Sequence, residues 1–179
     1  MPLSLYLAGP DVFRPDARAI AARKKALCAA HGFEGLDPLD NPLPELPDKR
    51  QVAMAIFRAN MSLMERADAV IANLTPFRSP SADPGTVFEL AWMLGRNRPA
   101  FAYSTVGTPY FERARAVFGG LDPSGDEIED FGLLDNLMID CALAQTGASI
   151  IIPPRHGLDP LWAFEGCLEA ASRHFHRGK

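Results

Sequence analysis

The stretch "ADAVIANLTPFRSPSADPGTVFELAWMLGRNRPAFAY", residues 67–103, decides the fold class. Its segment "DAVIANL" (68–74) is apolar with β-branched residues, which is typical of a buried central strand. Asp83 suits an N-cap and Pro84 suits the first helical position, so they predict a helix that begins there. "PAFAYS" (99–104) predicts a further strand. Alternating strands and helices indicate the α/β class, with a parallel sheet covered by helices on both faces.

The helix that begins at Asp83 is apolar on nearly every side except for one carboxylate, that of Glu89. This pattern predicts a helix that is buried on several sides. A buried carboxylate is costly unless something compensates it, whereas most glutamates are exposed, so the rest of the chain must decide between the two interpretations. The apolar positions are Val87, Leu90, Ala91 and Leu94 on one stripe, Phe88 and Trp92 on a second, and Met93 beside them.

Composition and length predict one globular domain spanning residues 1–179. The chain is 47% hydrophobic and 22% charged, and its net charge of -4 argues against a nucleic-acid polymer as partner. Its three cysteines, Cys28, Cys141 and Cys167, are far apart and suggest neither a disulfide framework nor a metal site. No apolar run is long enough to span a membrane, and no signal peptide is visible. A cytoplasmic protein is therefore expected.

The remaining chain continues the alternation and places three loops at one edge of the sheet. We expect the loops "AGPDVF", "DPLDNP" and "NLTPFRSPSADPGT" to converge, because ligands bind beyond the carboxyl ends of parallel strands. The segment between residue 104 and Asp130 is predicted to be a Gly/Asp-rich connector. The other expected strands cover residues 3–9, 33–36 and 149–154, and the other expected helices cover 15–31, 49–66, 136–144 and 160–175.

Asp83 and Glu89 form a pair of carboxylates at the start of one helix. Such a pair is used when a sugar C1 is attacked and its leaving group is protonated, with one acid ionised and the other not. Gly85 precedes Glu89 by about one turn and leaves room for a ligand against the helix. A phosphate at the helix N-terminus is the alternative, but neither GxGxxG nor GxxxxGK[ST] is present.

Three blocks of the chain resemble the nucleoside 2-deoxyribosyltransferases: "YLAGPDVF" (6–13), residues 67–103, and "DNLMI" (135–139). The resemblance implies a flavodoxin-like, five-stranded parallel sheet. It also implies transfer of 2-deoxyribose between nucleobases by double displacement, through a glutamate-linked sugar. The expected partners are a deoxynucleoside and a free nucleobase, and neither a metal nor another cofactor is expected.

The resemblance also implies roles for individual residues. Glu89 falls on the nucleophile, and Tyr6 falls on the tyrosine that orients it. Asp83 falls on an aspartate of the sugar site, where it either holds a hydroxyl group or handles the proton of the leaving base. Asn136 and Met138 fall on residues that neighbouring subunits lend to each other's sites, so a homo-oligomer is implied.

The base-facing side departs from the family pattern at two positions. Asn60 stands where some relatives have an aspartate, and an amide supplies no titrating proton. Pro42 stands where some relatives have a glutamine that contacts the base, which leaves the purine or pyrimidine preference open. Asp40 is then a candidate for base contacts, together with its neighbour Asn41. Gly9, Gly85 and Asn60 complete the expected substrate-binding residues.

Two other functions are compatible with the same sheet. A 2'-deoxynucleoside 5'-monophosphate N-glycosidase would pass the sugar to water and would need a phosphate site, for which Arg78, Ser79 and Ser81 are candidates. A non-catalytic nucleotide-binding module would bind its ligand in the same crevice and release no base.

Overall fold

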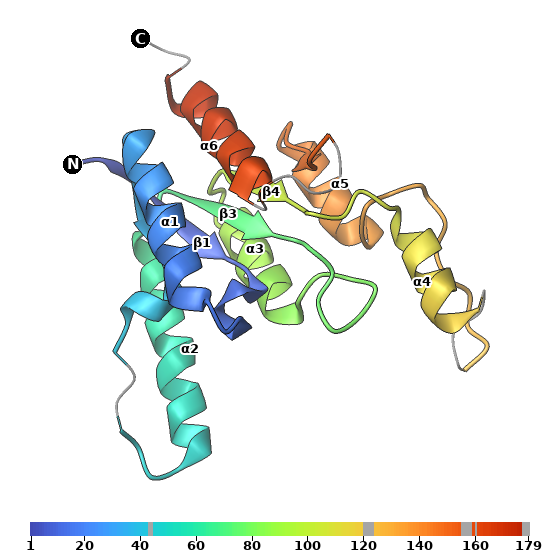
Figure 1. Ribbon diagram of the computed structural model, residues 1–179, viewed down its shortest axis with the longest axis horizontal. Helices are drawn as coiled ribbons and strands as arrows, with labels where there is room; N and C mark the ends of the chain where they lie inside the picture. Colours follow the sequence, from blue (N-terminus) through green and yellow to red (C-terminus); the bar gives the residue numbers. More distant parts are fainter. Residues whose placement is uncertain (43–44, 120–123, 155–158, 160, 177–179) are drawn as a thin grey trace.

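A computed structural model describes residues 1–42, 45–119, 124–154, 159 and 161–176 of the chain. Within these residues, five strands form one parallel sheet in the order β2-β1-β3-β4-β5 (Figure 1). The order reverses between β1 and β3, which opens a crevice at the carboxyl ends of these strands. The predicted flavodoxin-like sheet is confirmed. The strands are β1 (Leu3–Ala8), β2 (Phe33–Leu36), β3 (Ala69–Asn73), β4 (Ala100–Tyr103) and β5 (Ile150–Ile151).

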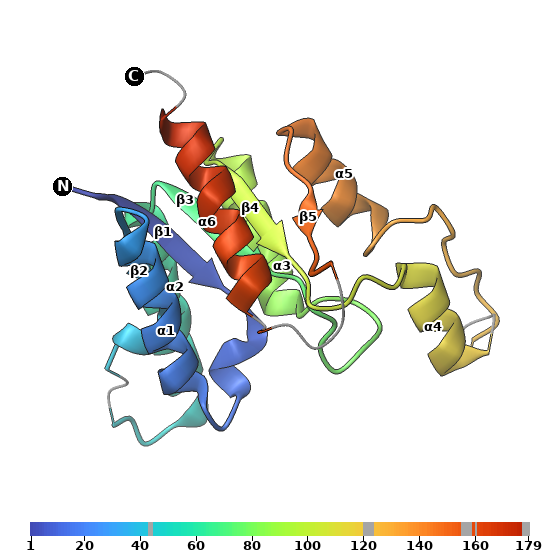
Figure 2. The same ribbon diagram turned by 45° about the horizontal axis from the view of Figure 1, so that its top comes forward.

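Helices cover both faces of the sheet, as predicted (Figures 1 and 2). One face carries α1 (Ala17–Ala30) and α6 (Leu161–His176), which contact each other and the strands. The other face carries α2 (Lys49–Arg66), α3 (Pro84–Gly95) and α5 (Leu137–Gln145). In the described part of the chain, no helix is long and apolar enough to cross a membrane.

Alternation along the strands divides the apolar side chains between two cores. Tyr6 and Val70 belong to the core beneath α2, α3 and α5, whereas their neighbours Leu5 and Ile71 belong to the core beneath α1 and α6. Successive side chains of a strand point to opposite faces of the sheet, which accounts for this division. The Tyr6 side chain consequently points from β1 toward the face that carries α3.

Three helices begin at side-chain caps that the sequence contains. Asp83 accepts a hydrogen bond from the Thr86 backbone N–H at 2.9 Å, which confirms the predicted start of α3. Asp48 accepts from two N–H groups of α2, and Asn136 accepts from the Met138 N–H at the start of α5. These caps satisfy N–H groups that a helix leaves unpaired.

The structure corrects three details of the predicted fold, and a fourth lies outside the described residues. Residues 110–118 form a helix, α4 (Tyr110–Phe118), inside the expected connector, and α4 lies away from the sheet (Figure 2). Its apolar residues recur at helical spacing, but the Gly and Asp residues around them led to the prediction of a connector: Tyr110, Phe111, Ala114, Val117 and Phe118. The last strand is shorter than expected, with only two residues paired. The helix α3 is not buried on every side, because Phe88 is 49% exposed. The expected helix start at Pro160 lies outside the described residues.

Candidate active site

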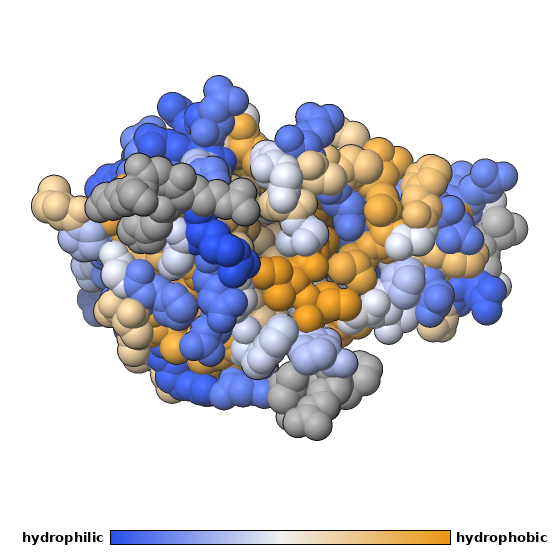
Figure 3. All heavy atoms as spheres, turned by 90° about the horizontal axis from the view of Figure 1, so that it is seen from above, coloured by the Kyte–Doolittle hydropathy of each residue, from blue (hydrophilic) through white to orange (hydrophobic). Residues whose placement is uncertain are grey.

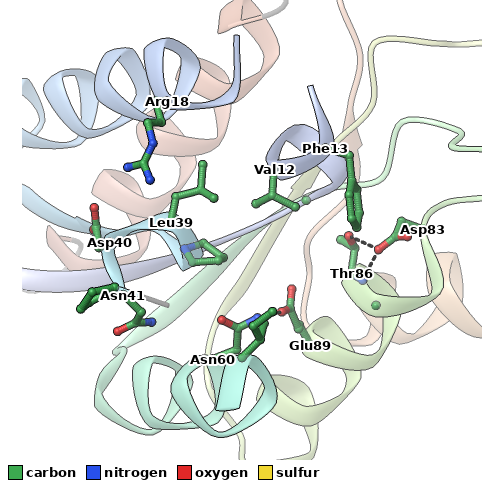
Figure 4. Close-up of a pocket in the computed structure, with 15 residues that line it drawn as sticks. Val12, Phe13, Arg18, Leu39, Asp40, Asn41, Asn60, Asp83, Thr86 and Glu89 are labelled. Atoms are coloured by element: carbon green, nitrogen blue, oxygen red, sulfur yellow. Dashed lines mark hydrogen bonds between the residues drawn. The ribbon is translucent and has the colours of Figure 1, made fainter. Parts of the chain in front are cut away.

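A pocket of about 800 Å³ lies at the carboxyl edge of the sheet (Figure 4). The loop after β1 forms the short helix η1 (Pro10–Phe13), and the loop after β2 forms η2 (Pro38–Asp40). Both line the pocket together with α2 and the first turns of α3. The predicted convergence of the loops is therefore confirmed for η1 and η2, whereas the long loop before α3 contributes only its last residue, Asp83.

Glu89 projects from α3 into this pocket and is held by two hydrogen bonds. The Tyr6 hydroxyl donates to Glu89 Oε1 at 2.6 Å, and the Asn60 side-chain amide donates to the same oxygen at 3.4 Å. Tyr6 is fully buried, so its position is fixed by the packing of the sheet. The short Tyr6 bond holds the carboxylate in place, and the orienting role that the resemblance implied for Tyr6 in catalysis stays a prediction.

The pKa values of this pair are strongly shifted by the apolar surroundings. Burial raises the pKa of Glu89 to about 7, and the nearby Asp83 charge adds to the rise, while the hydrogen bonds from Tyr6 and Asn60 act in the opposite direction. Burial and the Glu89 charge raise the pKa of Tyr6, which keeps its hydroxyl protonated as a donor. A carboxylate that titrates near neutral pH inside a pocket is typical of a catalytic group.

Asp83 lines the pocket at the N-terminus of α3, less than two turns before Glu89. The backbone N–H and the hydroxyl of Thr86 both donate to Asp83 Oδ2, at 2.9 and 3.1 Å. Among the described residues, none donates a hydrogen bond to Oδ1 in the structure, which leaves that oxygen for a ligand. Gly85 also lines the pocket, and a β-carbon there would lie 3.0 Å from Asp83 Oδ2.

A buried ion pair holds the loop that carries Gly9. Lys24 donates to Asp11 Oδ2 at 2.6 Å, and the Asn73 amide donates to the same oxygen at 3.0 Å. Burial would raise the pKa of Asp11, but the Lys24 ammonium outweighs it and the pKa is lowered. Gly9 fits tightly here, because a β-carbon would lie only 2.8 Å from Cβ of Asn73. The predicted glycine is therefore required by the close approach of η1 to β3.

The far end of the pocket is formed by η2 and the first turn of α1. Asp40, the predicted base contact, lies here and forms an ion pair with Lys25 at 2.7 Å. Asn41 also lines the pocket, and its side-chain nitrogen has no hydrogen-bond partner among the described residues. Arg18 extends from α1 toward Leu39 and Asp40 (Figure 4). Apolar side chains, including Val12 and Leu39, form the walls between the two ends.

Two of the predicted site residues lie away from the pocket of their own chain. Asn136 caps α5 and donates to Glu129 Oε2 at 3.1 Å, and Met138 is 71% exposed. Both are tied to the loop before α3, because the buried Asp135 accepts from the Ala82 N–H at 2.9 Å and from the Ser81 hydroxyl. That a neighbouring subunit uses these residues stays a prediction.

The candidate phosphate-binding residues are engaged elsewhere. The Ser79 hydroxyl donates to the Ser81 carbonyl, and the Ser81 hydroxyl donates to Asp135. Arg78 stacks over the rings of Phe13 and Phe77, at 4.9 and 4.5 Å from their centroids. None of these three side chains, those of Arg78, Ser79 and Ser81, lines the pocket around Glu89.

Several residues that line the pocket were not predicted to belong to the site. The sequence features that could have identified them differ from residue to residue. Val12 and Phe13 stand in a loop that was expected to converge on the site, so that expectation could have included them. Thr86 is 1% exposed and follows Asp83 in the capping turn. No sequence feature marks Arg18 as a pocket residue, because basic residues on a surface helix are common. In the described residues, no cluster of three or more His, Cys, Asp or Glu side chains is arranged to hold a metal.

Comparisons with known proteins agree with this geometry. The model of the nucleoside 2-deoxyribosyltransferase family matches residues 5–138. A solved 2-deoxyribosyltransferase from Leishmania mexicana is 29% identical, with a TM-score of 0.70 over 97% of this chain and 99% of that chain. A 2-deoxyribosyltransferase from Bacillus psychrosaccharolyticus is 18% identical, with a TM-score of 0.50 over 74% of this chain and 90% of that one, and shows the shared fold.

A protein of Schizosaccharomyces pombe, itself uncharacterized, is 35% identical over 83% of this chain and 80% of its own length. The predicted family and enzyme class are thus confirmed by a family model that matches most of the chain and by a fold shared along nearly all of it. The chain belongs to the nucleoside 2-deoxyribosyltransferase family.

Proposed function

We propose that the protein transfers 2-deoxyribose from a deoxynucleoside to a second free nucleobase by double displacement. The observation that supports this most is the Glu89 carboxylate, which lies in the pocket and accepts a hydrogen bond from Tyr6 at 2.6 Å, and whose pKa burial raises to about 7. An oriented carboxylate next to a second acid matches the requirements for attack on a sugar C1. Residues 1–179 act as one domain in this proposal.

In the first step, ionised Glu89 attacks C1 of the sugar and the nucleobase departs from the opposite face. The bond between C1 and the base nitrogen breaks as the bond to a Glu89 oxygen forms. Tyr6 keeps the attacking carboxylate in place, and Asp83 Oδ1 is available to a sugar hydroxyl. In the second step another base attacks C1 and releases Glu89, so the configuration at C1 is retained.

The walls of the pocket support transfer rather than hydrolysis. Water must be scarce around a glycosyl ester that waits for a second base. The apolar side chains beside Glu89 on α3, those of Phe88, Trp92 and Met93, do not line the pocket. Val12, Leu39 and Ile56 supply apolar walls instead. The N-glycosidase alternative lacks support, because Arg78, Ser79 and Ser81 form no phosphate site beside Glu89.

The test is one reaction that contains a deoxynucleoside and an excess of a second base. Initial rates of new nucleoside formation and of free 2-deoxyribose release are measured together. We expect exchange to exceed hydrolysis by more than about tenfold. Release of free sugar that dominates at saturating acceptor would move the protein to the hydrolases. Tight binding without release of any base would identify a non-catalytic binding module.

We infer further that the protein works as a homo-oligomer with shared sites. Met138 is 71% exposed, and apolar surface gathers on the side of the molecule that carries α4 and α5 (Figure 3). Exposed apolar side chains that gather on one side of a protein are typical of an interaction surface. Mixing Glu89→Ala with Asn136→Ala protein should then restore about a quarter of wild-type activity in a dimer, because half the dimers are mixed and each has one intact site. Wild-type activity of Asn136→Ala alone would place Asn136 outside the site, and two inactive variants that do not recover after subunit exchange would contradict a shared site.

The three cysteines are free, and Cys28 and Cys167 are buried. Free thiols are compatible with the reducing cytosol, where we expect the enzyme to act in nucleoside salvage.

A further inference from the structure

The pocket has two chemically different ends, and the reaction decides which end receives the base. This inference rests on the proposed function, in which Glu89 attacks C1 from one face of the sugar. The base then leaves from the opposite face and points away from Glu89. Figure 4 shows Arg18 and Asp40 across the pocket from Asp83 and Thr86. We define the base end of the pocket as Val12, Arg18, Pro38, Leu39, Asp40 and Asn41.

Two polar groups at the base end are hydrogen-bond donors without a described partner. Arg18 forms no hydrogen bond or ion pair with the part of the chain that the structure describes, although it lines the pocket. Asp40 could have neutralised it, but its carboxylate is paired with Lys25 at 2.7 Å. The shielded side-chain nitrogen of Asn41 is a second donor without a described partner. A ligand that satisfies these groups must present acceptors toward them.

We propose that the base end selects purines that carry an oxygen at C6, with Arg18 as the specificity-determining residue. In hypoxanthine and guanine, O6 and N7 are adjacent acceptors that match the two parallel N–H groups of a guanidinium. Adenine presents an amino group in place of O6, so one donor of Arg18 would face another donor. Pyrimidines lack the N7 and O6 pair altogether. The Val12 and Leu39 side chains offer apolar walls for a flat ring.

The same contact explains how the base can leave without an acid beside it. Asn60 carries no titrating proton, and Asp40 is held by Lys25. When the bond between C1 and N9 breaks, its electron pair passes to the purine while a Glu89 oxygen bonds C1. The purine anion spreads its charge to N7 and O6, where the Arg18 guanidinium stabilises it, and the purine then takes a proton from water. An acceptor purine gives its N9 proton to water and attacks by the reverse path.

The experiment lets two acceptors compete for one enzyme intermediate. Hypoxanthine and adenine are supplied at equal concentrations with deoxyguanosine as donor, and initial formation of deoxyinosine and deoxyadenosine is measured. Because both bases attack the same glycosyl-enzyme, their product ratio does not depend on the donor or on the fraction of active protein. We expect the ratio to favour deoxyinosine in the wild type. In Arg18→Met, the preference should fall about tenfold or more.

Arg23→Met is the matched control, because Arg23 lies on the same helix and pairs with Asp159 outside the pocket. Its product ratio should equal that of the wild type. A ratio that Arg18→Met leaves unchanged would overturn the proposal while leaving the transferase function intact. Hydrolysis of deoxyguanosine without any exchange would instead overturn the proposed function itself.

A phosphate contact is the competing role for an unpaired arginine. It predicts that Arg18→Met lowers kcat/KM for deoxyinosine 5'-monophosphate far more than for deoxyinosine. The base-reading role predicts equal losses for both donors and a changed acceptor ratio. A loss confined to the monophosphate would therefore refute the base-reading role of Arg18.

Discussion

The two ends of the pocket differ in how their polar groups are held. We define the sugar end as the part of the pocket formed by Asp83, Thr86 and Glu89. There the fully buried Tyr6 donates to Glu89 at 2.6 Å, and Asp83 accepts two hydrogen bonds from Thr86. At the base end, Arg18 is exposed and unpaired among the described residues, and the Lys25–Asp40 ion pair is about 40% exposed on each side. Rigid groups suit a reaction centre, where small displacements are costly.

This difference indicates at which end of the pocket the amino-acid sequence can change without loss of the fold. Changing a sugar-end residue disturbs the packed sheet or the helix cap of α3, because Tyr6 belongs to the core and Asp83 is the N-cap. The polar residues of the base end, Arg18, Asp40 and Asn41, lie on the exposed side of α1 and in or next to η2, so they can change without disturbing the core. The chemistry is thus tied to the fold, whereas the choice of base is not.

Removing the nucleophile should produce the largest effect. Glu89→Ala is expected to lose transfer by about four orders of magnitude or more, because no other described residue places a carboxylate at that position. Activity is measured as formation of the exchanged nucleoside, and folding is checked by circular dichroism. A well-folded Glu89→Ala protein that retains exchange would show that Glu89 is not the nucleophile.

Removing the Tyr6 hydroxyl should have a smaller effect that also changes the pH profile. Tyr6→Phe is expected to lower kcat about 10- to 100-fold, since the carboxylate loses its orienting bond. Glu89 must be ionised to attack, so activity should fall below about pH 7 in the wild type. The Tyr6 bond favours the charged form, so its loss raises the pKa of Glu89 and moves this fall to higher pH.

The control for Tyr6→Phe is Tyr110→Phe, which removes a hydroxyl group from α4, outside the pocket. Its rate and pH profile should match the wild type. If Tyr6→Phe lowers the rate but leaves the pH profile unchanged, Tyr6 acts through packing alone.

The sugar end was predictable from the sequence because its residues are close together in the chain or lie in regular elements. Asp83 and Glu89 share a helix whose cap is visible in the sequence, and Tyr6 lies in a short apolar strand. Strand pairing then brings Tyr6 beside Val70 and toward α3. Local pattern and the resemblance together predicted the fold and which residues meet here, whereas their roles stay predictions.

The base end was less predictable because it depends on the shapes of loops and on one helix face. Asp40 was identified, but its pairing with Lys25 depends on how η2 packs against α1. Arg18 is one of several basic residues on α1, and no local pattern separates it from Arg23. The helix α4, which packs away from the sheet, was missed for a different reason: Phe111, Ala114 and Phe118 recur at helical spacing, but the Gly and Asp residues around them suggested a connector.

Neutralising Glu89 should raise stability at high pH. Its folded-state pKa of about 7 lies above the ordinary value of 4.5, so its contribution to stability is present at low pH and is lost between about pH 4.5 and 7. Glu89→Gln keeps an acceptor for Tyr6 and removes the buried charge. We expect a Tm higher than that of the wild type by on the order of 5 °C at pH 8, and no difference at pH 4.5. Equal Tm values at pH 8 would mean that the carboxylate is not destabilised by burial.

The smallest effect is expected at the base end, where Asp40→Asn removes the charge that pairs with Lys25. The pair is exposed, so Tm should change by no more than about 2 °C. The KM for the acceptor base should change by about two- to threefold, because the unpaired Lys25 ammonium alters the electrostatic field around the base. The kcat should stay the same. Lys25→Met should change KM in the opposite direction. A fall in kcat of more than tenfold for every acceptor would instead assign Asp40 a proton-transfer role, because it is the one acid among the described pocket residues that lies at the base end. That outcome would also remove the contrast between a rigid reaction centre and an adjustable base end, since both ends would then carry catalytic groups.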